Sequence, residues 1–127
     1  MNFPFNSRHG LILVDAELDG PRGTAVLRLA LDTGATYTLI NVALLVAVGY
    51  DPALAPGRVQ ITTGSGVEFV PRISVTKLKA LGRERLAFPI LAHTLPPSAG
   101  VDGLLGLDFL RGLALHVDFR QGQMSLT

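Results

Sequence analysis

Apolar and polar residues alternate along short stretches of this chain, a pattern typical of half-buried β-strands. The first two stretches, residues 11–18 and 24–31, are separated by the turn-rich segment 19–23. Two strands joined by such a turn predict a β-hairpin. The second strand would end directly before Asp32, so the hairpin would place this carboxylate at the end of a strand.

Further strands are predicted at residues 37–40, 58–63, 67–79, 86–92, 113–119 and 124–127. Segments rich in glycine, proline or polar residues separate most of them and indicate turns or loops, at residues 64–66, 81–83, 96–100 and 121–123. Pro71 interrupts the strand at 67–79, which suits an edge strand or a bend. This series of about eight short strands predicts a mostly β fold.

Two short helices are predicted between the strands. Asn41 is a good N-cap residue for a helix over residues 42–48, which would end at Gly49. This helix is apolar on nearly all sides, so we expect it to be buried. The segment 104–110 is also mostly apolar, contains Gly106 and is expected to end as a second short helix.

The length and composition predict one domain, residues 1–127. A chain of this size can bury about two thirds of its unfolded surface, so it needs no disulfide or metal to fold. The hydrophobic fraction of 48% is high and suggests an oligomer. There is no cysteine, so thiol chemistry is excluded.

The net charge of +1 and the lack of a basic tract argue against nucleic-acid binding. A local basic cluster is interpreted as a solvated face; it comprises Lys77, Lys79, Arg83 and Arg85. The N-terminus has no signal-peptide pattern, and the longest apolar stretch, 42–48, is too short to span a membrane. We therefore expect a cytoplasmic protein, or a soluble domain of a longer one.

The strongest chemical signal is the sequence Asp32-Thr33-Gly34-Ala35. Peptide hydrolysis without a metal or a covalent nucleophile needs two carboxylates that share one proton around a water. Each carboxylate must be held by a tight loop, and Gly34 permits an unusual backbone angle and an exposed N–H. Thr33 offers a hydroxyl to lock the loop, and Ala35 is small enough to let a substrate strand approach.

Other polar residues suit structural roles. Asp102 is expected in a turn, Asp108 near the second helix and Asp118 on the surface. The histidines show no metal-binding spacing, so neither a metal nor a cofactor is expected; they are His9, His93 and His116. Asp32 itself could be an ordinary turn residue, although the strands around it favour a site.

The order of LALDTGATYTLI, a glycine-containing hairpin and VDGLLGLDFLRG resembles the retropepsin-like aspartic proteases, particularly their single-domain bacterial branch. The resemblance extends from about residue 11 to residue 127. It implies a closed, barrel-like, mostly β fold with one or two short helices. It also implies a two-fold homodimer, because each chain supplies only one Asp-Thr-Gly triplet.

The same resemblance implies roles around Asp32. Thr33 would brace the two loops across the dimer axis, while Gly34 and Ala35 would line the floor of the site. An apolar segment would pack under the loop, formed by Leu104, Leu105 and Gly106.

A flap would close over an extended peptide, and its expected residues are Thr63, Gly64, Ser65 and Gly66. The turn at residues 81–83 is a rival candidate for the flap. Retroviral relatives carry an arginine directly after the glycine that matches Gly106, where this chain has Leu107, so its dimer contacts must differ.

The sequence thus favours an aspartic endopeptidase that uses two Asp32 carboxylates and no cofactor, with a peptide or protein as substrate. The alternative is a catalytically weak or inactive module of the same fold, which binds peptides or mediates dimerisation. Cleavage by the wild type but not by Asp32→Ala would separate the two.

Overall fold

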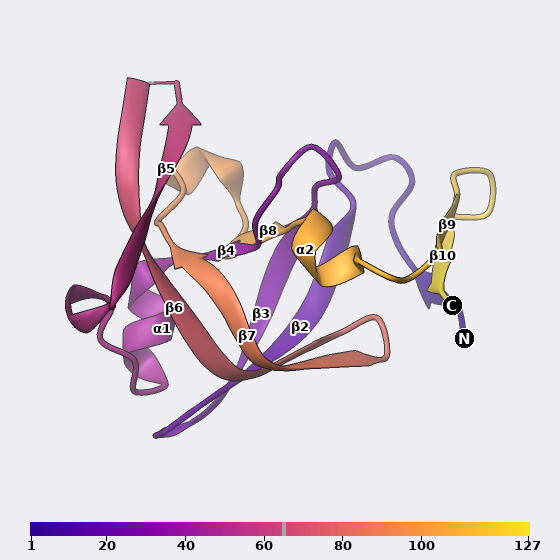
Figure 1. The fold of residues 1–127 in the computed structure, drawn as a ribbon. Coiled ribbons are helices and arrows are strands. Elements are labelled where there is room, and N and C mark those ends of the chain that lie inside the picture. The colour runs from indigo at the N-terminus through magenta and orange to yellow at the C-terminus, as the bar shows by residue number, and fades with distance from the viewer. Residues whose placement is uncertain (65) are drawn as a thin grey trace.

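A computed structural model describes residues 1–64 and 66–127 (Figure 1). The strands are β1 Phe3–Pro4, β2 Leu13–Gly20, β3 Gly23–Leu31, β4 Leu39–Ile40, β5 Gly57–Thr63, β6 Gly66–Ala80, β7 Arg83–Ala92, β8 Gly103–Leu105, β9 Leu115–Asp118 and β10 Gln123–Leu126. The helices are α1 Val42–Ala47 and α2 Leu107–Leu110, and there are short 3-10 helices at Pro52–Leu54 and Pro97–Ala99. The predicted mostly β fold with two short helices is confirmed.

The main sheet closes into a barrel of six strands. Its hydrogen-bonded order is β2-β3-β8-β4-β7-β6, and an additional pairing between β2 and β6 joins the two ends. Closure leaves these strands without a free edge, which is how small β-domains avoid unpaired backbone groups. The barrel-like part of the fold prediction is therefore confirmed.

The long strand β6 belongs to both the barrel and a projecting hairpin. Residues 77–80 pair with β2, and residues 72–80 pair with β7. Residues 66–72 pair with β5, so that Arg72 has a partner on each side, and Figure 1 shows this β5–β6 hairpin standing away from the barrel. Pro71 lies in the part of β6 that leaves the barrel, in agreement with the predicted bend or edge.

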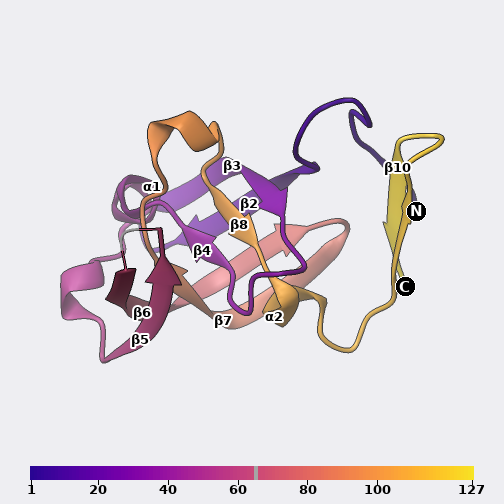
Figure 2. The ribbon, with the colours of Figure 1, turned by 90° about the horizontal axis from the view of Figure 1, so that it is seen from above.

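Parallel pairing brings distant segments together beside Asp32. Strand β3 pairs in parallel with β8, matching Leu31 with Leu105, and β4 pairs with β8 on its other side. The view in Figure 2 shows β8 between β3 and β4. The loop after β3 therefore begins directly beside the segment 103–106.

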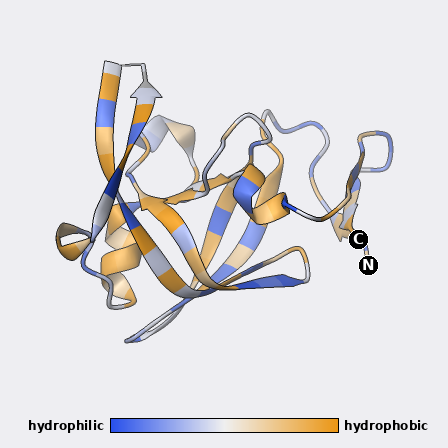
Figure 3. Ribbon diagram, in the orientation of Figure 1, coloured by the Kyte–Doolittle hydropathy of each residue, from blue (hydrophilic) through white to orange (hydrophobic). Residues whose placement is uncertain are grey.

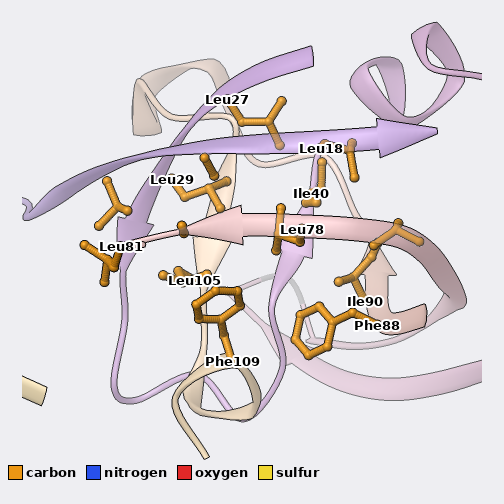
Figure 4. Packing of buried hydrophobic residues seen from close by; sticks show 14 of the residues in the cluster. Leu18, Leu27, Leu29, Ile40, Leu78, Leu81, Phe88, Ile90, Leu105 and Phe109 are labelled. Atoms are coloured by element: carbon orange, nitrogen blue, oxygen red, sulfur yellow. The ribbon is translucent and has the colours of Figure 1, made fainter. Parts of the chain in front are cut away.

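The barrel interior is filled by aliphatic and aromatic side chains (Figure 4), and hydrophobic residues alternate with polar ones along the barrel strands (Figure 3). Its large, fully buried members include Leu18, Leu27, Leu29, Ile40, Leu78, Ile90, Leu105 and Phe109. Burying each such side chain stabilises the fold by about 1.5–3 kcal/mol. The Phe88 and Phe109 rings meet edge to face, with centroids 5.9 Å apart.

The two chain ends form a second, smaller sheet with the order β1-β10-β9. Figures 1 and 2 both show it beside the barrel, with the N- and C-termini close together. Strand β1 and strand β8 were not expected as strands from the sequence, because each has only two or three residues and no room for an alternating pattern.

Helix α1 differs from its prediction in two ways. Only Leu45 is fully buried in it, and Val46 is 52% exposed, so the expectation of burial on nearly all sides is wrong. One face of the helix packs on the barrel, and solvent covers the other. The Asn41 side chain also does not cap the helix; its Oδ1 accepts a hydrogen bond from the Leu95 N–H at 3.0 Å.

The basic cluster is only partly the solvated face that was expected. Lys79 and Arg83 are exposed, and Lys77 pairs with Asp19 at 3.3 Å. The hydrogen bond to Asp19 and the charge of its carboxylate raise the pKa of Lys77. The expectation of a solvated side chain is wrong for Arg85, because its guanidinium turns inward and donates to the Phe109 and Arg111 carbonyls.

Within the described part of the chain, no helix combines the length and apolar character required to cross a membrane.

Candidate active site

The loop after β3, residues 32–38 and here called the Asp32 loop, holds the Asp32 side chain through its own backbone. Asp32 Oδ1 accepts a hydrogen bond from the Gly34 N–H at 2.9 Å, and the Asp32 carbonyl accepts one from the Ala35 N–H at 3.2 Å. The Asp32 N–H donates to the Leu105 carbonyl at 3.0 Å, which attaches the loop to β8. The carboxylate is half-buried and has a defined orientation at the end of the strand.

Leu104, Leu105 and Gly106 lie against the Asp32 loop. Leu105 is fully buried, and the Leu107 N–H donates to the Ala35 carbonyl at 2.8 Å. A Cβ atom on Gly106 would lie 2.7 Å from the Tyr37 carbonyl carbon and 2.9 Å from the Ala35 carbonyl oxygen. Since these are backbone atoms, only glycine allows the two segments to approach this closely.

A buried hydroxyl connects the same two segments, and sequence reasoning missed it. Thr38 is 0% exposed; its Oγ1 donates to Asp108 Oδ1 at 2.7 Å and accepts from the Gly106 N–H at 3.0 Å. The Thr38 N–H also donates to Asp108, whose Oδ1 further accepts from the Phe109 N–H at 2.8 Å. Asp108 therefore has the structural role near α2 that was expected. The signal for Thr38 was a polar residue directly before the apolar pair Leu39-Ile40.

A groove of about 930 Å³ lies between the β5–β6 hairpin and residues 35–37, which follow Asp32; Asp32 itself is not among its described lining residues. Its apolar lining consists mainly of Ala35, Tyr37, Leu39, Ile61, Leu91, Leu95, Pro96 and Leu104. Its polar lining includes Gln60, Thr62, Glu68, His93 and Thr94. The groove has the concave, largely apolar character of a ligand site.

The hairpin at residues 57–72, which contains the residues expected to form the flap, borders the groove, and its Gly64 lines it. Ser65 and the side chain of Thr63 fall outside the described part of the structure. Gly66 begins β6 at a φ of 120°. The rival turn, Leu81-Gly82-Arg83, lies elsewhere, because Gly82 faces the Phe3 ring of the N-terminal segment.

The remaining loop residues face outward. Thr33 and Gly34 are exposed, and among the described residues no hydrogen bond is made by the Thr33 hydroxyl.

Asp102 has a structural role, since its Oδ2 accepts a hydrogen bond from the Arg28 N–H at 2.8 Å. The described residues contain no group of three or more histidine, aspartate or glutamate side chains that could hold a metal ion.

Comparison with known proteins agrees with this geometry. Residues 14–112 match the model of the gag-polyprotein putative aspartyl protease family. Among solved structures, a retropepsin-like aspartic protease from Rickettsia conorii is similar, with a TM-score of 0.73 and 16% sequence identity. The match covers 99% of this chain and 88% of that one. No curated protein sequence gave a significant match. The chain therefore belongs to the gag-polyprotein putative aspartyl protease family, and it has the retropepsin-like fold.

Proposed function

We propose that this protein is an aspartic endopeptidase whose active site forms when two copies pair. The observation that carries the proposal is the Asp32 loop, in which backbone hydrogen bonds orient a carboxylate beside β8 in a chain of an aspartyl protease family. The sequence contains one Asp-Thr-Gly triplet, so the second carboxylate must come from a second copy.

The chemistry follows from two carboxyl groups placed close together. At a separation of about 3 Å both cannot ionise, so they share one proton. The ionised Asp32 removes a proton from a water, which adds to the scissile carbonyl, while the protonated Asp32 donates to the carbonyl oxygen. The tetrahedral diol then collapses as the leaving amine gains a proton. Activity is expected below neutral pH, because one carboxyl must stay protonated.

The groove supports a peptide as the substrate. An extended chain lying between the β5–β6 hairpin and the Asp32 loop could form main-chain hydrogen bonds in the manner of an added strand. The exposed Thr33 hydroxyl and the exposed Gly34 are available to face the second copy and the peptide backbone. The hairpin would act as a flap that excludes water from the reacting centre.

The test is cleavage of a diverse peptide library between acidic and neutral pH by the wild type, Asp32→Asn and Asp15→Asn. Asp15 is an exposed aspartate on β2, so its variant matches the change in charge away from the groove. We expect the wild type and Asp15→Asn to cleave alike, and Asp32→Asn to lose at least about a thousandfold in rate.

Equal cleavage by the wild type and Asp32→Asn would refute the assignment. Peptide binding without cleavage, by a wild-type protein shown to be folded and dimeric, would favour a binding module of the same fold.

A further inference from the structure

The groove carries one acidic side chain, Glu68, among its described lining residues. Glu68 lies on β6 opposite Ile61 of β5, so the two side chains share one face of the hairpin. Val70, two residues further along, is 5% exposed and packs with Leu39 and Leu91. Because side chains on a strand alternate, Glu68 and Val70 point the same way, toward the groove.

The opposite face of the hairpin is different. Val67 and Phe69 alternate with Glu68 and are 57% and 64% exposed. Glu68 is also exposed, so its carboxylate lines the groove and remains in contact with water. The Glu68 carboxylate is therefore accessible to a ligand that enters the groove.

The Glu68 carboxylate has no positive partner in the part of the chain that the structure describes. The salt bridges found there join Lys77 to Asp19 and to Glu84. Neither lysine nor arginine is among the described lining residues of the groove. Arg72 shares the strand face, but four residues along a strand amount to about 13 Å. Its guanidinium also lies over the Tyr37 ring, 5.9 Å from the centroid.

We propose that Glu68 selects a lysine or arginine side chain of the bound peptide. Apolar side chains of the same peptide would fill the rest of the groove. This inference rests on the proposed function and names the substrate class. The apolar walls would receive the aliphatic part of the basic side chain, and the carboxylate would pair with its charged end. Binding removes water from the groove, which strengthens the attraction between opposite charges.

The probe is a set of peptides that differ at one position, which carries lysine, its apolar analogue norleucine, or glutamate. Each position of a cleaved sequence is varied in turn, and kcat/KM is measured for the wild type, Glu68→Gln and Glu68→Lys. Glu17→Gln is the matched control, because Glu17 is an exposed glutamate on β2 outside the groove. Its variant makes the same change in net charge.

At one or more positions we expect the wild type and Glu17→Gln to prefer lysine over norleucine by about threefold to tenfold. Glu68→Gln should lose this preference, and Glu68→Lys should prefer glutamate. A wild type without a basic preference, or a preference unchanged in Glu68→Gln, would overturn the inference while leaving the protease function intact.

If no peptide is cleaved, the proposed function fails and the inference is judged by binding. Fluorescence anisotropy of the labelled peptides then compares the wild type with Glu68→Gln. Tighter binding of the lysine peptide that depends on Glu68 supports the inference, and equal or absent binding refutes it.

Discussion

Thr38 shows how one side chain can join segments that are far apart in the sequence. Its hydroxyl donates to Asp108 and accepts from the Gly106 N–H, while its carbonyl accepts from the Leu91 N–H at 3.0 Å. A buried polar group must find such partners, because leaving it unpaired costs about 1–3 kcal/mol. The partners here are the segments on either side of β4, so Thr38 stabilises the support of the Asp32 loop.

Replacing Thr38 with valine keeps the shape of the side chain and removes only the two hydrogen bonds of the hydroxyl. We expect Thr38→Val to lower the free energy of unfolding by about 2–3 kcal/mol, because the Gly106 N–H and part of Asp108 lose their partner. Thr38→Ser keeps the hydroxyl and should lose only about 1 kcal/mol, from the missing methyl group. Urea denaturation measures both values. A valine variant as stable as the serine variant would show that the hydroxyl contributes nothing.

Helix α2 has only four residues, too few for a helix to be stable by itself. Arg85 of β7 stabilises its end. The guanidinium donates to the Phe109 carbonyl at 2.6 Å and to the Arg111 carbonyl at 2.7 Å, and lies 5.6 Å from the Phe109 ring centroid. A planar group with several fixed donors suits this double contact better than an ammonium group does. The barrel wall thereby holds the helix that carries Asp108.

Arg85→Met retains much of the aliphatic stem and removes the donors. We expect a loss of about 1–3 kcal/mol in the free energy of unfolding, because two carbonyls lose a charged partner. Arg83→Met is the matched control, since Arg83 is exposed and should change stability by less than about 0.5 kcal/mol. Thermal or urea unfolding distinguishes the two. Similar losses in both variants would mean that the contacts of Arg85 are not what stabilises α2.

At the scale of the whole molecule, the single Asp-Thr-Gly triplet is the decisive feature. One carboxylate cannot act as both acid and base in the same step, so the proposed chemistry requires two chains. The exposed side of the Asp32 loop, with Thr33 and Gly34, is the surface that such a dimer would bring together. The unit of function would then be the pair, although each chain forms its own barrel.

Mixing wild type with Asp32→Asn tests this requirement. If subunits exchange freely, equal amounts of the two leave about one quarter of the dimers with two wild-type chains. The activity should therefore fall to about half of that of the same amount of wild type assayed alone. Cleavage rates and sedimentation are measured together to verify exchange. Activity that is unaffected by the variant in exchanging dimers would show that one chain suffices.

The local pattern of this sequence determined most of its elements. Alternation of apolar residues predicted the hairpin of β2 and β3, the long strand β6 with its bend at Pro71, and the strands near the C-terminus. Strand formation and turns depend on neighbouring residues, so they can be predicted without knowledge of distant contacts. The Asp32 loop was also found this way, because its residues are consecutive.

The tertiary structure decided which distant segments meet. The parallel pairing of β3 with β8, the Thr38–Asp108 network and the inward turn of Arg85 all join residues far apart in the chain. Helix α1 shows the same limit, since its apolar sequence did not reveal that one side faces solvent. Burial and pairing across the barrel depend on how the sheet closes, and no local pattern contains that information.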